Sequence, residues 1–224
     1  MPNLSLETYL KRICQICARQ GDRPIPAAKL ADAVRVPIAT CTNVLLALKE
    51  AGLAAYQPYE GVMLTEAGRV LALRALRRQR LVEQFLARTL NLGDDEVRCE
   101  AEQIEPAFSD ALVERIDEFL GFPPTCPHGD PIPRAEGTAP APSSRSLTEL
   151  TMGKTFRLVR VLDQTPDFLR YLSQQGLTLD VVGEVVSNQV ETGIVSVRTS
   201  TGTTALPRDV AAKLLVMPPQ AASA

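Results

Sequence analysis

The chain has 224 residues, of which 45% are hydrophobic and 22% are charged, as in ordinary globular proteins, and its length is enough for two domains. No apolar run approaches the ~20 residues of a membrane span. The first residues also lack the basic-then-apolar order of a signal peptide. We therefore expect a cytoplasmic protein with no membrane partner.

The net charge of −2 is distributed unevenly along the chain. Residues 1–90 contain 13 Lys/Arg and 7 Asp/Glu, whereas residues 91–224 contain 11 and 19. A basic N-terminal part followed by an acidic remainder fits a DNA-binding module attached to something that does not touch DNA.

The N-terminal part is predicted to be a winged helix-turn-helix. After a first amphipathic helix over residues 5–20, residues 27–34 and 40–50 carry apolar side chains at helical spacing. Pro37 suits the first turn of the later helix. Two short extended pieces, 54–57 and 62–65, then form a hairpin. In this motif the second helix enters the major groove and the hairpin lies along the DNA backbone.

We accordingly predict that residues 1–74 bind double-stranded DNA. Short polar side chains on the reading helix can reach base edges or phosphates. An ordinary helical hairpin, or a wing used for protein contacts, is the alternative. The candidate DNA-contacting residues are Pro37, Thr40, Thr42, Asn43 and Tyr59.

Two long helical stretches follow. Residues 65–91 form an arginine-rich amphipathic helix with Thr65 as its N-cap, and residues 94–120 form another. Pro106 removes a hydrogen bond in the second stretch and should kink or split it, with Ser109 capping the continuation. Apolar helices directly after a DNA reader commonly form a two-fold interface. We therefore expect a homodimer and assign residues 75–133 to a helical domain for dimerisation and effector binding.

The remaining segments change in character. Residues 121–133 are too rich in Pro and Gly for regular structure. Residues 134–146 have the composition of a flexible linker, and residues 218–224 that of a disordered tail. Short alternating runs between residues 147 and 217 predict about five strands in a small closed barrel of SH3-like type. The fold class is thus mainly α, a winged helix-turn-helix plus a helical dimerisation domain, with an all-β SH3-like barrel at the C-terminus.

Several stretches of the sequence carry a family resemblance when taken in order. They are ETYLKRI, YEGVMLTEAGR, RLVEQFL, EAEQIEPAFSDALVERIDEFLG and CPHGDPIP. In this order and spacing the chain resembles the diphtheria-toxin-repressor family of metal-dependent transcriptional regulators, and its end is similar to the FeoA-like SH3 domain of ferrous-iron transport proteins. The resemblance implies a homodimeric, sequence-specific transcriptional regulator, a repressor concerned with iron or manganese homeostasis. No nucleophile–base pair or phosphate-binding loop is visible, so we expect no enzyme.

The resemblance also implies a divalent iron or manganese ion. By position, Glu83, Glu102 and Glu105 match ligands of the family. The chain departs from the family pattern at other ligand positions, which are Thr8, Lys11, Gln79, Arg98 and Pro106. The Lys11 ammonium could pair with Glu102 or Glu105 in place of a metal. Cys126 and His128, in a loop shared with the family, are interpreted as a structural turn, with a metal role as the alternative.

Two alternatives follow from these departures. Cys14 and Cys17 on the first helix, with Cys99, could form a thiol site for redox sensing, an iron–sulfur cluster or zinc. Cys14 and Cys99 would approach each other if their helices run antiparallel. The same cysteines could equally be small buried apolar residues. The protein would then be a constitutive DNA-binding protein that has lost its effector site.

Overall fold

A computed structural model describes residues 5–20, 23–90, 92–134 and 144–219. These residues form two compact units. The first contains the residues up to 78 together with 133–134, and the second contains residues 79–132 and those from 144 onward.

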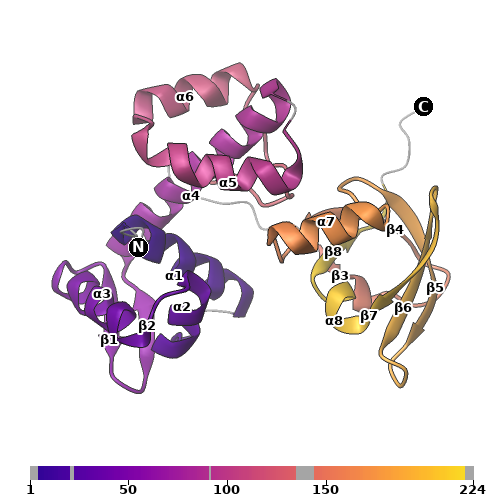
Figure 1. The fold of residues 1–224 in the computed structure, drawn as a ribbon, viewed down its shortest axis with the longest axis horizontal. Helices are drawn as coiled ribbons and strands as arrows, with labels where there is room; N and C mark the ends of the chain where they lie inside the picture. The colour runs from indigo at the N-terminus through magenta and orange to yellow at the C-terminus, as the bar shows by residue number, and fades with distance from the viewer. Residues whose placement is uncertain (1–4, 21–22, 91, 135–143, 220–224) are drawn as a thin grey trace. The chain divides into compact units, whose positions relative to one another are not determined.

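The first unit is a winged helix-turn-helix, as the sequence predicts (Figure 1). Its core is made by the apolar stripes of the helices and one face of the hairpin, including Leu10, Ile13, Leu30, Leu45 and Val62. Its elements are α1 (Leu6–Gln20), α2 (Ala27–Val34), α3 (Ile38–Glu50), β1 (Ala54–Gln57), β2 (Gly61–Leu64) and the start of α4 (Glu66–Leu90).

Local signals set the ends of these elements. Pro37 is the N-cap of α3 and not its first residue, so the helix begins at Ile38, earlier than expected from the apolar pattern. The predicted cap of α4 is confirmed, because the Thr65 hydroxyl accepts a hydrogen bond of 3.1 Å from the Gly68 N–H. At the hairpin turn Tyr59 has a φ of 70°.

The helices of the second unit show the predicted break at Pro106. It divides the stretch into α5 (Asp94–Ile104), a 3-10 turn η1 (Glu105–Ala107) and α6 (Asp110–Phe119). The Ser109 hydroxyl accepts a hydrogen bond from the Leu112 N–H at 3.3 Å and restarts the helix. Two small apolar clusters hold these helices to the C-terminal half of α4, one of them formed by Val82, Leu86, Val97 and Ala101.

The C-terminal part of the second unit is an antiparallel six-stranded sheet in the order β3-β8-β4-β5-β6-β7 (Figure 1). We call this part, residues 145–217, the β-domain. The inward faces of the strands and of helix α7 pack into its own core. Its elements are β3 (Arg145–Ser146), η2 (Leu147–Glu149), β4 (Thr155–Val161), α7 (Pro166–Gln174), β5 (Val182–Gln189), β6 (Ile194–Thr199), β7 (Gly202–Pro207), α8 (Arg208–Ala211) and β8 (Leu214–Met217).

The end of the β-domain combines a short helix and a strand. Helix α8 ends at Ala211, and Leu214 begins strand β8. The sequence from Leu214 to Met217 is apolar at every position, so it has no alternation that would distinguish a strand from a helix.

The predicted linker (134–146) and the predicted tail (218–224) lie for the greater part outside the described residues. Among the helices of the described residues, none is by itself long and apolar enough to cross a membrane.

Candidate functional site

The exposed side chains in the first half of helix α3 are short and uncharged. Thr40 and Asn43 are exposed, while Thr42 is half-buried and its hydroxyl donates to the carbonyl of Ile38 at 2.9 Å. Pro37 is exposed at the start of the helix, and Tyr59 is fully exposed at the hairpin turn. The predicted DNA-contacting side chains therefore lie at the surface of the first unit, Thr42 in part.

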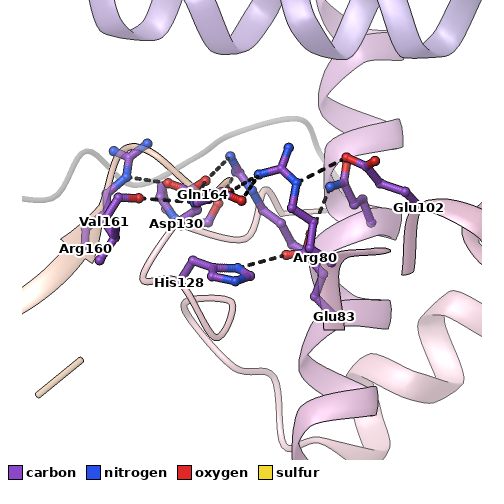
Figure 2. A network of polar contacts seen from close by, with 11 residues as sticks. Arg80, Glu83, Glu102, His128, Asp130, Arg160, Val161 and Gln164 are labelled. Atoms are coloured by element: carbon purple, nitrogen blue, oxygen red, sulfur yellow. Dashed lines mark hydrogen bonds and ion pairs between the residues drawn. The ribbon is translucent and has the colours of Figure 1, made fainter. Parts of the chain in front are cut away.

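The second unit brings together a carboxylate, a thiol and an imidazole. Glu83 of α4 meets Cys126 and His128, and one potential ligand atom from each lies within 4.8 Å of the others. All three side chains are buried, with exposed fractions of 2%, 3% and 1%. His128 Nδ1 lies 3.7 Å from Glu83 Oε2 (Figure 2). We call these three residues the donor cluster.

Two of the three donors come from one tight loop, residues 125–131, which we call the donor loop. The Cys126 N–H donates to the Asp130 carbonyl and the Gly129 N–H to the Cys126 carbonyl, both at 2.9 Å. Thr125 and Pro131 close the loop as an antiparallel bridge. Gly129 has a φ of +78°, which favours glycine. Two residues that are close in the sequence are thus held rigidly opposite Glu83.

The electrostatics of the donor cluster differ between its members. Burial alone would raise the pKa of Glu83, but the His128 imidazole and the Gln79 amide, which donates to Glu83 Oε1 at 2.8 Å, outweigh it and lower that pKa. Burial raises the pKa of the Cys126 thiol well above its usual value, and the carboxylates of Glu83 and Asp130 add to this effect. Glu83 is therefore ionised at neutral pH, while Cys126 would have to give up a proton to bind a metal.

The donor set is suited to a transition metal. Thiolate and imidazole are ligands of zinc and iron, and a carboxylate completes the kind of three-residue set that leaves a further position open. The burial of all three side chains supplies the dry surroundings in which such bonds are strong. The residues present fit a divalent metal of this class.

The other two predicted metal ligands do not belong to the donor cluster. The Glu102 side chain is 43% exposed and forms an ion pair of 3.2 Å with Arg98, one turn earlier on α5. Glu105 is buried in the turn η1. Among the described residues, neither belongs to a group of three or more potential metal ligands. The structure thus unites Glu83 with residues that were interpreted as a structural turn, and not with Glu102 or Glu105.

The signal for Cys126 and His128 was present in the sequence. His128 is the only histidine of the chain, and a cysteine lies two residues before it. The turn interpretation described the backbone of this loop, and the alternative of a metal role named the donors that it carries.

The cysteines of the thiol alternative are spread over both units. Cys14 and Cys17 are half-buried on α1 of the first unit, and Cys99 is exposed on α5 of the second. Their predicted approach stays a prediction. Cys41 is buried in α3, and burial raises its pKa, as expected of a thiol used for packing.

A winged helix-turn-helix joined to a second unit with buried transition-metal donors defines the class of a DNA-binding regulator with a candidate metal site. Two family models match the chain. "Iron dependent repressor, metal binding and dimerisation domain" matches residues 65–134, and "FeoA domain" matches residues 145–218.

Individual relatives agree. An HTH-type transcriptional regulator of Methanocaldococcus jannaschii is 33% identical over 116 residues, 52% of this chain and 92% of the relative. The iron-dependent repressor IdeR of Mycobacterium tuberculosis is 30% identical over 160 residues, 68% of this chain and 69% of the relative. A solved manganese-dependent transcriptional repressor in complex with manganese is 36% identical with a TM-score of 0.87, and the match covers 96% of this chain and 100% of that one. The chain belongs to the diphtheria-toxin-repressor family of metal-dependent transcriptional repressors, a family without enzymatic activity.

Proposed function

We propose that this protein is a homodimeric repressor whose binding to an operator in duplex DNA depends on a divalent transition metal held by Glu83, Cys126 and His128. One observation carries the proposal, namely the convergence of three buried donor side chains within 4.8 Å in a member of a metal-dependent family. Residues 1–74 would read DNA, and residues 75–133 would dimerise and hold the metal.

The donors favour zinc or ferrous iron over manganese. Manganese is suited to carboxylate, carbonyl and water oxygens, whereas this cluster contributes one sulfur, one nitrogen donor and one carboxylate. The solved relative described above was crystallised with manganese, so the preference of this chain would be its own. The regulated genes would belong to the homeostasis of the preferred metal.

The homodimer is supported by exposed apolar side chains on the second unit. Four large side chains on α4 and α6 or directly after α6 are exposed by 44–70%, and contact with a second copy would remove them from water. They are Leu90, Leu112, Phe119 and Phe122. The family model that spans this region is named for dimerisation as well as metal binding. Phe119→Glu should therefore convert the dimer to a monomer in sedimentation equilibrium.

DNA reading would use the exposed side chains of α3 and the hairpin. Asn43 can pair with a base edge, and replacing it by Ala should cost about 1–3 kcal/mol of discrimination between bases. Affinity should fall steeply with salt, because contacts to phosphates release counterions. Equal affinity for all sequences in the unmodified protein would contradict sequence-specific reading.

The test of the whole proposal is DNA binding by the untagged protein to a duplex selected from a random library, with zinc, ferrous iron or manganese, or with a chelator. We expect the unmodified protein to bind DNA only when metal is present. Metal should no longer increase DNA binding by Cys126→Ser, while Cys99→Ser should behave like the unmodified protein. Binding that is equally tight in chelator would favour a constitutive protein. A response to oxidant that Cys99→Ser abolishes would favour the thiol alternative.

A further inference from the structure

The donor loop is held from two sides by parts of the second unit. On one side is helix α4 and on the other is the β-domain. The contacts converge on Asp130, which is 4% exposed and lies two residues after His128 (Figure 2).

Helix α4 holds the loop through Arg80. This guanidinium lies 3.3 Å from Asp130 Oδ2 and donates to the Pro131 carbonyl at 2.5 Å. Arg80 and Glu83 are three residues apart, so they lie on the same face of the helix. One helix face therefore presents both a metal ligand and the clamp that holds the other two ligands in place.

The β-domain holds the loop through side chains near the end of β4. Arg160 Nε donates to Asp130 Oδ1 in a short ion pair, and Gln164 Nε2 donates to Asp130 Oδ2 at 3.0 Å. Gln164 is itself fixed by Arg98, which donates to its Oε1 at 2.9 Å. The buried carboxylate of Asp130 is thus surrounded by two cations and an amide. Two of these three partners, Arg160 and Gln164, belong to the β-domain.

The backbones are in contact as well. The Val161 N–H donates to the His128 carbonyl at 3.1 Å. A Cβ on Gly129 would lie 1.9 Å from the Val159 carbonyl oxygen, so the loop packs directly on the strand. The backbone of His128, a proposed metal ligand, is therefore hydrogen-bonded to the β-domain.

We propose that Asp130 is a positioning residue, through which the β-domain sets the metal affinity of the donor cluster. The inference rests on the proposed metal site and adds to it. When the clamp on Asp130 is intact, Cys126 and His128 stay opposite Glu83 and a metal does not have to order them. Because coupling between two equilibria is reciprocal, a bound metal must in turn tighten the β-domain on the loop.

The experiment is a titration of the untagged full-length protein with cobalt(II), whose absorption spectrum reports both the cysteine–cobalt bond and the coordination geometry. Asp130→Asn removes the charge at constant shape, and Arg160→Met removes one of the two β-domain side chains that hold Asp130 and leaves the clamp of α4 in place. We expect both variants to bind one cobalt with an affinity roughly 10- to 100-fold lower, as for other residues that support metal ligands, and with altered visible bands.

A matched control is available on the same strand. Arg157 also forms an ion pair with an aspartate, Asp180 at 2.8 Å, but away from the donor loop. Arg157→Met should leave the cobalt affinity and the spectrum unchanged, which separates positioning from a general loss of charge on β4. Asp130→Glu, which restores the charge, should recover part of the affinity. If Asp130→Asn does not fold by circular dichroism, Arg160→Met with its Arg157→Met control decides the question.

The reciprocal effect has its own readout. Metal should slow hydrogen exchange of the Val161 amide in the unmodified protein, and much less in Arg160→Met. Unchanged cobalt affinity and spectrum in the folded variants would overturn the inference and leave the metal site standing. Absence of cobalt binding by the unmodified protein would overturn the metal site and the inference with it.

Discussion

Glu83 and Glu102 were both expected to bind metal, and the structure gives them opposite surroundings. Glu83 is buried and faces a thiol, an imidazole and an amide. The Glu102 side chain is 43% exposed and faces the guanidinium of Arg98. A cation beside a carboxylate competes with a metal for the same charge. We therefore expect metal binding at Glu83 and not at Glu102, because of what each carboxylate faces.

The sharpest way to break this comparison is to neutralise each carboxylate at constant shape. Glu83→Gln should weaken zinc binding at least about 100-fold, or ~2.7 kcal/mol, because it removes a ligand outright. Glu102→Gln should change it less than about 3-fold, since Arg98 already occupies that carboxylate. Competition with a chromophoric chelator measures both. A larger effect of Glu102→Gln would reverse the assignment of the two carboxylates.

A second comparison concerns two glycines with almost the same backbone angle. Gly129 in the donor loop has a φ of +78° and Gly121 has a φ of +74°, but only at Gly129 would a Cβ meet another atom within 4 Å. Gly121→Ala should cost about 1 kcal/mol of unfolding free energy, the strain of a left-handed residue. Gly129→Ala should cost about 2 kcal/mol more, because the loop must separate from β4.

Urea denaturation of the two variants tests this difference. The Gly129→Ala variant should also bind zinc more weakly, whereas Gly121→Ala should not. Equal unfolding free energies would mean that the loop can shift at little cost, and that its packing on β4 does not hold the donors.

A smaller effect is expected on the stability of the fold when the exposed ion pair of Arg98 and Glu102 is removed. Glu102→Gln should lower the unfolding free energy by no more than about 0.5 kcal/mol, because a pair with one partner largely in water is screened. Thermal unfolding in low and in 1 M salt measures this contribution. A cost that persists in high salt would show that the pair is shielded from solvent, contrary to the exposure of Glu102.

The smallest effect concerns Asp163, which follows β4 and is a carboxylate paired like Glu102. Burial alone would raise the pKa of Asp163, but hydrogen bonds from Lys213 at 2.9 Å and from Thr165 outweigh it and lower that pKa. Its stabilising contribution is thus complete above the pKa of the unfolded chain, near 3.9, and is lost as the pH falls through the lower pKa of the folded state. Unfolding free energies of the unmodified protein and of Asp163→Asn should therefore approach each other as the pH falls below about 4, and parallel curves would contradict this.

The sequence was sufficient where local chemistry decides the structure. Pro106 cannot continue a helix and Ser109 can start one, so the break between α5 and α6 follows from two residues. The hairpin and the Thr65 cap follow in the same way. Strand β8 could not be predicted, since its uniformly apolar residues become alternately buried only after pairing with β4.

The donor cluster could not be predicted from local sequence signals, and the reason differs from that for β8. Glu83 lies on a long helix and its two partners lie in a loop far along the chain, so only the packing of that loop on α4 brings them together. Position in a family pattern pointed to Glu83 together with Glu102 and Glu105, because it says where a ligand is usual and not which charge faces it in this chain. The replacement of a histidine by Arg98 was visible, but its ion pair with Glu102 and its bond to Gln164 needed coordinates.

The buried position of His128 also has a practical value for spectroscopy. The chain contains one histidine and no tryptophan. In untagged protein, the ring protons of this imidazole give an NMR signal that needs no assignment among other histidines, and it arises from inside the donor cluster. In solutions of the purified protein, its chemical shift and linewidth can therefore follow occupancy of the cluster by diamagnetic or paramagnetic ions, with no label attached to the molecule.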